Sequence, residues 1–177
     1  ALQNKIFSIN IESESELERI IKVSEDLKIK ADCFIRLNPE ISSESHPYIQ
    51  TALKSSKFGV DADTAIKIAK VIKQSKQVNL IGIASHIGSQ ISKESLVLEN
   101  LDSLLNVLKI LEEDQKINFV DIGGGFGITY KDEKDLKPSE ILPKIIDKVG
   151  PNINIILEPG RSISGKAGIL ITKTEYI

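Results

Sequence analysis

Methionine and tryptophan are absent from this 177-residue sequence, and cysteine occurs only once, as Cys33. A single cysteine excludes an internal disulfide framework and fits a reducing compartment, so we expect a cytoplasmic protein. Aromatic residues make up 5%, and only three arginines, Arg19, Arg36 and Arg161, stand among the 23 basic residues. Because methionine is missing even at position 1, we expect the sequence to be a piece of a longer protein.

Long apolar runs and an excess of charge of one sign are also missing. No stretch of about 18 apolar residues occurs, so no membrane span is expected. The first five residues lack the apolar core of a signal peptide. A formal net charge of -2 argues against nucleic-acid binding through phosphate neutralisation. The remaining composition, 41% apolar and 27% charged, is that of one soluble globular domain.

The residues that are present alternate between strand-like and helix-like segments. Strands are predicted over residues 5–10, 31–37, 78–85, 117–122 and 153–157, and more weakly over 168–177. Helices are predicted to begin after the capping residues Ser13, Asp61 and Ser92 and near Ser139, with Pro143 tolerable only in a first turn. Residues 40–56 read as a loop with one helical turn. The alternation indicates parallel βαβ units.

Two parallel architectures fit this alternation. A complete (β/α) barrel needs eight strands and typically about 250 residues, which is more than the sequence has. A doubly wound sheet therefore fits the length better, unless the sequence is a fragment of a barrel.

Polar residues follow the predicted strands at the points where those strands end. Arg36 and Asn38 close one strand, His86 follows the next, Asp121 the next, and Glu158 the last. Since the carboxyl ends of parallel strands meet at one edge of the sheet, we expect these side chains to converge there.

The glycines after Asp121 allow two interpretations. Gly123, Gly124 and Gly125 could bring backbone N–H groups close to an anion such as a phosphate, or they could form only a tight turn. Neither the dinucleotide fingerprint nor the phosphate-binding P-loop pattern is present, so the motif alone does not decide between them.

Each of the other polar candidates also has a structural and a functional interpretation. Glu158 and Arg161 could form an ion pair, or could face a cationic ring nitrogen and an anionic group respectively. His86 could be a hydrogen-bonded core residue, and Ser89 could bind an anion or cap a turn. His46 reads as a solvated loop residue.

Two further kinds of site are not supported by the sequence. Cys33 lies in mid-strand and reads as a buried apolar residue. No two His, Cys or carboxylate residues stand at the spacing typical of metal ligands. The G-x-S-x-G motif, which positions the nucleophile of many serine hydrolases, does not occur.

The ordered set of motifs resembles one family. His86-Ile-Gly-Ser-Gln90, Asp121-Ile-Gly-Gly-Gly-Phe-Gly127 and Glu158-Pro-Gly-Arg-Ser162 resemble the pyridoxal-phosphate-dependent amino-acid decarboxylases with an alanine-racemase-like barrel. The segments 36–39, 46–49 and 57–59 are similar to the branch that acts on meso-diaminopimelate. The resemblance implies a lyase that releases CO2 and forms L-lysine, the last step of lysine biosynthesis. It also implies pyridoxal 5'-phosphate as cofactor.

The resemblance implies a role for each matching residue. His86 would stack on the cofactor ring, and Glu158 would pair with the pyridine nitrogen. Ser89 and the Gly123–Gly125 loop would hold the phosphate. Pro159, Gly160 and Arg161 would lie nearby, with Arg161 also reaching a substrate carboxylate. Asp121 would orient the loop.

The same resemblance implies that parts of the family's enzyme lie outside this sequence. Residues 1–166 would form an incomplete (β/α)8 barrel, and residues 167–177 a strand leading toward a C-terminal β-domain. No Tyr-Ala-x-Lys segment supplies the family's Schiff-base lysine, so we expect the fragment alone to be inactive. The intact protein would be a cytoplasmic homodimer.

Three alternatives remain at this point. The first is a decarboxylase of ornithine, arginine or a polyamine precursor. The second is a non-catalytic pyridoxal-phosphate-binding barrel protein, and the third is a doubly wound domain without a cofactor.

Overall fold

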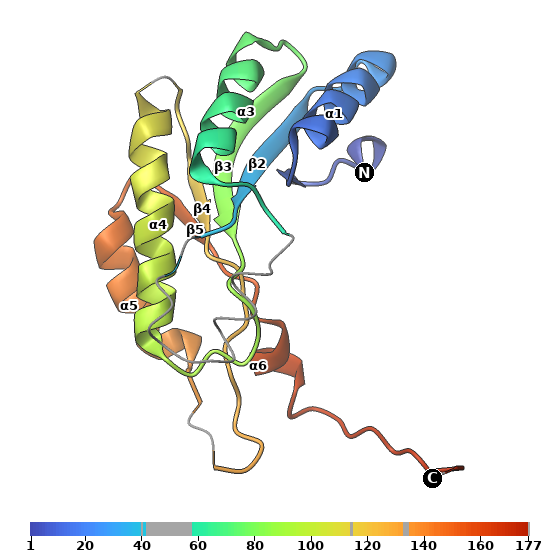
Figure 1. The fold of residues 1–177 in the computed structure, drawn as a ribbon, viewed down its shortest axis with the longest axis vertical. Helices are drawn as coiled ribbons and strands as arrows, with labels where there is room; N and C mark the ends of the chain where they lie inside the picture. The colour runs from blue at the N-terminus through green and yellow to red at the C-terminus, as the bar shows by residue number, and fades with distance from the viewer. Residues whose placement is uncertain (40, 42–57, 114, 133–134, 177) are drawn as a thin grey trace.

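Five parallel strands form the centre of the fold in a computed structural model (Figure 1), which describes residues 1–39, 41, 58–113, 115–132 and 135–176. The strands are β1 (Ile9–Ile11), β2 (Ala31–Leu37), β3 (Val78–Ser85), β4 (Phe119–Asp121) and β5 (Asn154–Ile156). They lie side by side in the order β1-β2-β3-β4-β5, and every neighbouring pair is parallel. The helical turn predicted within residues 40–56, and His46, lie outside the described residues.

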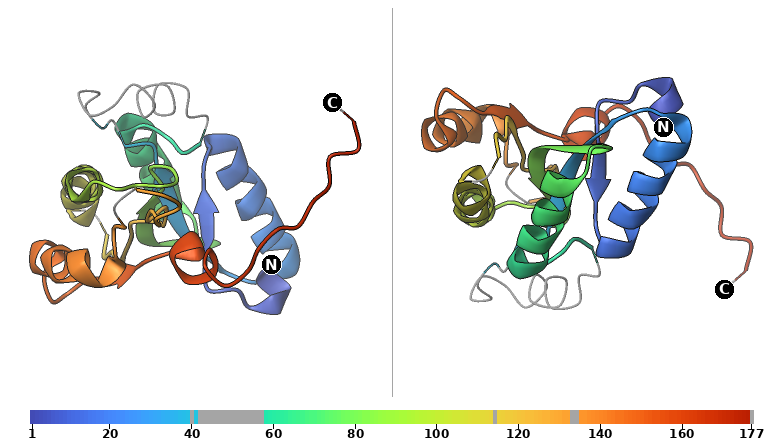
Figure 2. Two further views of the ribbon diagram at one scale, coloured as in Figure 1. Left: turned by 90° about the horizontal axis from the view of Figure 1, so that it is seen from below. Right: turned by 90° about the horizontal axis from the view of Figure 1, so that it is seen from above.

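Helices connect successive strands and cover one face of the sheet. They are α1 (Glu14–Leu27), α3 (Ala62–Gln74), α4 (Glu94–Glu112) and α5 (Pro138–Val149), preceded by the 3-10 turn η1 (Leu2–Asn4) and followed by α6 (Gly160–Ser164). Seen along the strands, α1, α3, α4 and α5 form an arc around one side of the sheet (Figure 2). The apolar side chains between these helices and the strands form the buried core.

The sequential strand order decides between the two architectures. A doubly wound sheet reverses its strand order at a switch point, and its helices lie on both faces. Here the order never reverses, so the chain builds consecutive βα units of a (β/α) barrel. The partial (β/α) barrel that the family resemblance implies is therefore confirmed. Length alone favoured a doubly wound sheet unless the sequence was a fragment, because length limits how much of a barrel is present and not how its strands are ordered.

Two predicted helix starts are confirmed. The Ser13 hydroxyl accepts a hydrogen bond of 3.2 Å from the Glu16 N–H, and the Glu16 carboxylate accepts one of 2.7 Å from the Glu12 N–H. Asp61 caps α3 by accepting a 2.8 Å hydrogen bond from the Thr64 N–H. In both cases a side chain satisfies backbone donors that a helix cannot satisfy internally.

The start of strand β1 and the start of helix α4 differ from the prediction. The first strand begins at Ile9 and not at residue 5, because η1 ends in a left-handed Lys5 (φ 53°), which leaves Phe7 58% exposed. Helix α4 is preceded by Lys93, which makes no side-chain cap, so the prediction that Ser92 caps it was wrong.

The C-terminal third departs further from expectation. Pro143 lies inside α5, in its second turn, so the expectation that it is tolerable only in a first turn was wrong. Helix α6 was not predicted. Residues 168–176 form no strand and extend as exposed chain away from the body (Figure 1). An isolated segment with no neighbouring strand has nothing to satisfy its backbone groups, so its weak alternation is not enough to form a strand.

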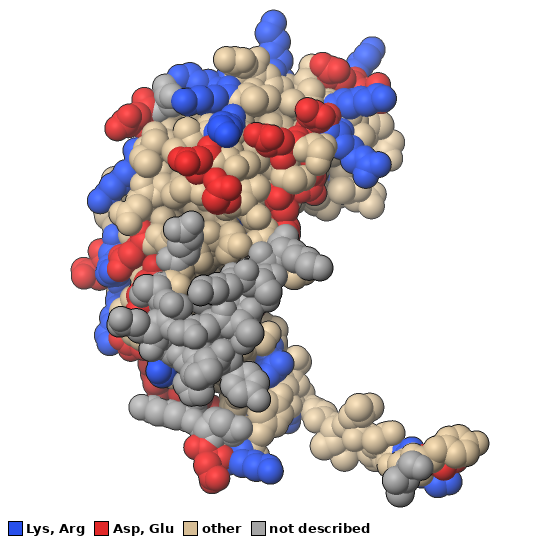
Figure 3. Space-filling view, in the orientation of Figure 1, with Lys and Arg blue, Asp and Glu red and all other residues tan. Residues whose placement is uncertain are grey.

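The burial of Cys33 is confirmed: its side chain is fully buried, and burial raises the pKa of the thiol to about 12. Among the described residues, no helix is long and apolar enough to cross a membrane. Basic and acidic side chains are interspersed over the face drawn in Figure 3.

Candidate functional site

A cavity of about 280 Å³ opens where the carboxyl ends of the strands meet. Its walls come from all five strands or the residues directly after them: Asn10, Arg36, Ala84, Ser85, His86, Asp121 and Glu158. The predicted convergence is therefore confirmed for Arg36, His86, Asp121 and Glu158. Asn38 does not join them, because it lines a separate pocket with Asp61 and Asp63 beside the start of α3.

The strand register explains why two charged side chains face each other across this cavity. Arg36 pairs with Ala84, and Ala84 pairs with Asp121, so the three residues form one row across β2, β3 and β4. Residues in register point to the same face of a sheet. The small side chain of Ala84 leaves room between the long Arg36 and the carboxyl of Asp121.

Arg36 is held in place from β1. Its Nη1 donates a 2.6 Å hydrogen bond to Glu12 Oε1, and its guanidinium lies 5.3 Å from the centre of the Phe58 ring. The other carboxylate oxygen of Glu12 accepts a 3.1 Å bond from the Gly59 N–H. Glu12 and Asn10 were both missed by sequence reasoning. For Asn10 a signal existed, because it is polar and closes the first predicted strand.

The surroundings of His86 favour the neutral form of its imidazole. Burial lowers its pKa first, the positive charge of Arg36 lowers it further, and the negative charge of Glu158 partly opposes them. Its Nδ1 accepts a hydrogen bond of 3.4 Å from the Gly124 N–H, which places the ring proton on Nε2. The imidazole is thereby tied to the glycine loop.

Asp121 ties the end of β4 to the same loop. Its Oδ1 accepts a 2.8 Å hydrogen bond from the Gly123 N–H, in agreement with the expectation that it orients the loop. The side chain is buried, and this burial raises its pKa to about 6. The Gly123 N–H opposes the shift, whereas the carboxyl of Glu158 adds to it.

The glycines themselves are required by close packing. Gly123 and Gly125 have φ values of +72° and +84°, which side-chain-bearing residues rarely adopt. A Cβ atom on Gly124 would lie 2.0 Å from the carbonyl oxygen of Glu158, and one on Gly125 would lie 1.9 Å from that of Gly88. The tight-turn interpretation is therefore supported, and anion binding by the loop stays a prediction.

Of the two interpretations of Glu158 and Arg161, the internal ion pair is not formed in the structure. Arg161 instead donates a 3.0 Å hydrogen bond from Nη1 to Gln90 Oε1, and its guanidinium lies 6.0 Å from the centre of the Tyr130 ring. Glu158 is exposed at the cavity, so water can solvate it and burial imposes no need for a cation.

The remaining candidates lie around the cavity without lining it. Ser89 is exposed in the loop after β3, and Pro159 and Gly160 lie at the start of α6. Behind the cavity, the Ser85 hydroxyl donates a 2.7 Å hydrogen bond to Asn100 on α4, a buried polar contact that sequence reasoning did not foresee. Within the described ranges, no group of three or more His, Cys, Asp or Glu side chains is arranged so that it could hold a metal ion.

Comparison with known proteins places this geometry in a family. Residues 1–165 match the model of the pyridoxal-dependent decarboxylases, pyridoxal binding domain. Diaminopimelate decarboxylases from Vibrio cholerae and Haemophilus influenzae are 38% and 37% identical to the whole chain. The chain spans about 43% of the length of each of these relatives.

Solved structures agree with the sequence matches. Diaminopimelate decarboxylase from Helicobacter pylori, complexed with L-lysine, superposes with a TM-score of 0.84 at 35% identity, over 92% of this chain and 42% of that one. The enzyme from M. jannaschii gives a TM-score of 0.82 at 33% identity, over 92% of this chain and 40% of that one. The match of residues 1–165 to the family model, together with the shared fold, shows that the chain belongs to the pyridoxal-dependent decarboxylase family and matches its pyridoxal binding domain.

Proposed function

We propose that the complete protein carrying this chain decarboxylates meso-diaminopimelate to L-lysine and CO2 with pyridoxal 5'-phosphate as cofactor. The observation that carries the proposal is the cavity at the carboxyl ends of the strands. It brings Arg36, His86, Asp121 and Glu158 together in a chain that belongs to this family. The similar proteins are named diaminopimelate decarboxylases, and one of their structures holds L-lysine.

The side chains present fit a pyridoxal phosphate group. A protonated ring nitrogen needs an accessible carboxylate, and Glu158 is exposed at the cavity. A flat ring needs a flat face to lie against, and His86 offers an imidazole whose lowered pKa favours the uncharged form. A phosphate needs cationic or N–H donors, and the glycine loop and Arg161 lie beside the same strand ends.

Glu158 and His86 are proposed to contact the cofactor ring. Glu158 would accept a hydrogen bond from the pyridine nitrogen and favour its protonated form, because a nearby negative charge raises the pKa of a cation. His86 would stack on the ring while Gly124 holds its Nδ1. When bound, the protonated ring supplies an electron sink for the pair left on the substrate carbon after CO2 departs.

The phosphate is proposed to lie on the loops around the cavity. Ser89 would donate from its exposed hydroxyl, and Gly123–Gly125 from their backbone N–H groups. Pro159, Gly160 and Arg161 would border the same group, with Arg161 also able to bind a substrate carboxylate. Asp121 would act indirectly, by holding the Gly123 N–H.

The assembly of the complete protein also belongs to this proposal. We infer a cytoplasmic homodimer whose active sites form where subunits meet, with residues 1–166 as the cofactor-binding barrel portion. Residues 167–177 would lead toward a β-domain. These features follow from the family resemblance and from the single, buried cysteine.

The proposal is tested on the complete natural polypeptide that contains residues 1–177. It should show the visible absorbance of bound pyridoxal phosphate and release CO2 from meso-diaminopimelate but not from ornithine. Glu158→Gln should retain the folded state and lower kcat by at least tenfold, because the ring nitrogen loses its negatively charged partner. Asp132→Asn, an exposed loop change, serves as the matched control.

Three other results of this experiment would contradict the proposal in different ways. Release of CO2 from ornithine or arginine in preference to diaminopimelate would contradict the proposed substrate. Cofactor absorbance without CO2 release from any amino acid would favour a non-catalytic binding protein. Absence of cofactor binding would overturn the proposal.

A further inference from the structure

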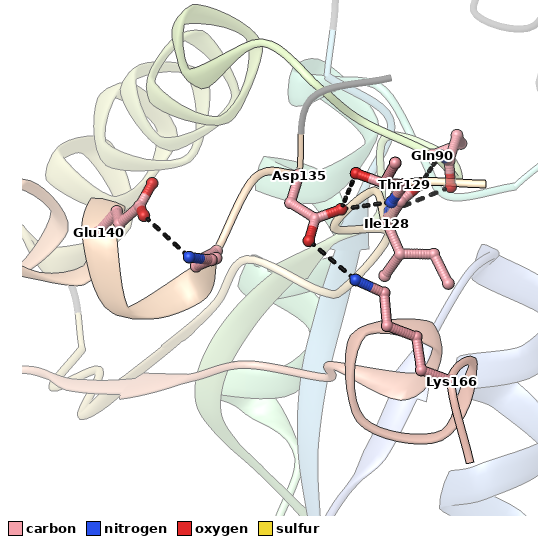
Figure 4. Close-up of polar contacts among 7 residues, drawn as sticks. Gln90, Ile128, Thr129, Asp135, Glu140 and Lys166 are labelled. Carbon is pink, nitrogen blue, oxygen red and sulfur yellow. Dashed lines mark hydrogen bonds and ion pairs between the residues drawn. The ribbon is translucent and has the colours of Figure 1, made fainter. Parts of the chain in front are cut away.

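The side chain of Gln90 connects its own loop to a second loop and to a helix. Its Nε2 donates a hydrogen bond to the carbonyl oxygen of Ile128, and its Oε1 accepts one of 3.3 Å from the Ile128 N–H (Figure 4). The same Oε1 accepts the 3.0 Å bond from Arg161 Nη1. The amide thus joins the loop after β3 to the loop after β4 and to the first turn of α6.

Backbone hydrogen bonds next to Gln90 hold the loop after β3 against the loop after β4. The Ile91 N–H donates to Gly125 O at 2.8 Å, and the Gly127 N–H donates to Ile91 O at 2.9 Å, so the two loops run alongside each other. Gln90 itself has a φ of +58°, a left-handed conformation that is uncommon for a residue with a side chain. Such a conformation persists where surrounding contacts hold it, as the two loops do here.

A second contact joins the loop after β4 to the residues that follow α6, without involving Gln90 or Arg161. Asp135 accepts hydrogen bonds from the N–H and hydroxyl of Thr129, and its other oxygen lies 3.1 Å from Lys166 Nζ (Figure 4). These donors lower the pKa of Asp135. The pair is therefore a structural link of the same kind and offers a matched control for Gln90.

Arg161 faces neutral groups at this junction. In the described part of the chain its guanidinium makes no ion pair with a carboxylate, and its partners are the Gln90 amide and the Tyr130 ring. The nearby carboxylate, Asp135, is paired with Lys166 instead. An arginine kept from carboxylates retains its charge for an incoming oxyanion.

We infer that Gln90 is a positioning residue that holds the Arg161 guanidinium against the loop after β4, where it receives an oxyanion of the bound cofactor or substrate. The inference rests on the proposed function. The oxyanion has two possible sources, the phosphate of pyridoxal phosphate and a carboxylate of the amino-acid substrate. A neutral amide suits this role because it orients the guanidinium without neutralising it, as a carboxylate would.

The test uses the complete natural polypeptide, freed of cofactor, and compares pyridoxal 5'-phosphate with pyridoxal. Gln90→Ala should weaken binding of pyridoxal phosphate about tenfold and leave pyridoxal binding within twofold, if the oxyanion is the phosphate. If the oxyanion is the substrate carboxylate, Gln90→Ala should leave the affinity for the cofactor unchanged. The KM for diaminopimelate should then rise about tenfold with kcat unchanged. Lys166→Gln should change none of these quantities.

A double-mutant cycle separates positioning from general stabilisation. Arg161→Ala should cause the same selective loss as Gln90→Ala, and adding Gln90→Ala to it should change the affected quantity by less than twofold. An equal loss for pyridoxal and its phosphate, full additivity of the two substitutions, or wild-type behaviour of Gln90→Ala would overturn the inference. A wild-type protein that binds neither ligand would overturn the proposed function, and the inference with it.

Discussion

The ring of Phe34 occupies the space next to Gly82 that a side chain would need. A Cβ atom on Gly82 would lie 2.2 Å from Phe34 Cε1. Phe34 pairs with Gly82, and Gly82 pairs with Phe119, so the three form the row two residues before Arg36, Ala84 and Asp121. Phe7 joins this aromatic row, with 5.1 Å between its ring centre and that of Phe119, so the rings of Phe7, Phe34 and Phe119 pack together on one face of the sheet.

Gly82→Ala is expected to destabilise the fold by about 1–3 kcal/mol, because the added methyl group must displace a buried ring. Urea unfolding of the variant measures this change. Gly168→Ala, where a Cβ would meet nothing within 4 Å, is the control and should be neutral. Combining Gly82→Ala with Phe34→Leu should cost less than the sum of the two, and a fully stable Gly82→Ala would contradict the packing argument.

Asn100→Ala is expected to lower the free energy of unfolding by about 1–3 kcal/mol, because it leaves the Ser85 hydroxyl without its acceptor. Asn100 is 1% exposed, so water cannot replace the lost bond. Adding Ser85→Ala should recover part of the loss, since no hydroxyl then remains unsatisfied. The exposed change Asn152→Ala is the control. Strict additivity of the two buried substitutions would argue against the contact.

Asp61→Ala is expected to remove about 1 kcal/mol of stability at pH 7, because α3 loses its N-cap. The hydrogen bonds from Thr64 lower the pKa of Asp61. Its contribution is therefore complete above the unfolded pKa of 3.8 and is lost as the pH falls through the folded value. Thermal melts between pH 2 and 7 should show wild type and variant converging in acid, and a constant gap would contradict the cap.

Asp121→Asn is expected to gain stability relative to wild type as the pH rises from about 4 to about 7. The folded protein keeps a proton on Asp121 up to about pH 6, whereas the unfolded chain loses it near pH 3.8. Ionisation therefore weakens the wild-type fold by up to about 3 kcal/mol as the pH rises through this window. The asparagine oxygen can still accept the Gly123 N–H.

Urea unfolding of Asp121→Asn and of the wild-type protein, measured between about pH 4 and about pH 7, tests this prediction. The difference between Asp121→Asn and wild type should be constant below pH 4 and grow above it. Asp132→Asn, an exposed substitution, should show no such growth. A difference that shrinks as the pH rises would show that Asp121 is stabilised in its charged form.

The elements that local patterns encode strongly were predictable from the sequence. The capping residues Ser13 and Asp61 carry their own signal, because each satisfies a backbone donor only three residues away. The buried strands β2 and β3 were predicted at their observed bounds. The start of β1 was missed because the apolar residues of 5–10 did not show that the 3-10 turn η1 and the left-handed Lys5 precede the strand.

The candidate site was predictable in part, because polar residues at strand ends form a pattern that can be read from a sequence. That pattern identified Arg36, His86, Asp121 and Glu158. It could not identify Glu12 or Asn100, because these residues act on partners that lie 24 and 15 positions away along the chain. It also left open whether Glu158 pairs with Arg161, since closeness in sequence does not show which way two side chains turn.

By itself the sequence determined the alternation of strands and helices and the chemistry available at the strand ends, because hydrophobic periodicity and residue type are local properties. Only the tertiary structure decided that the five strands run in sequential order, and so form part of a barrel. It also decided that Arg161 turns to Gln90 and that Asp121 is buried enough to keep its proton to about pH 6. Strand order, side-chain direction and desolvation all depend on neighbours that the chain brings together only when it folds.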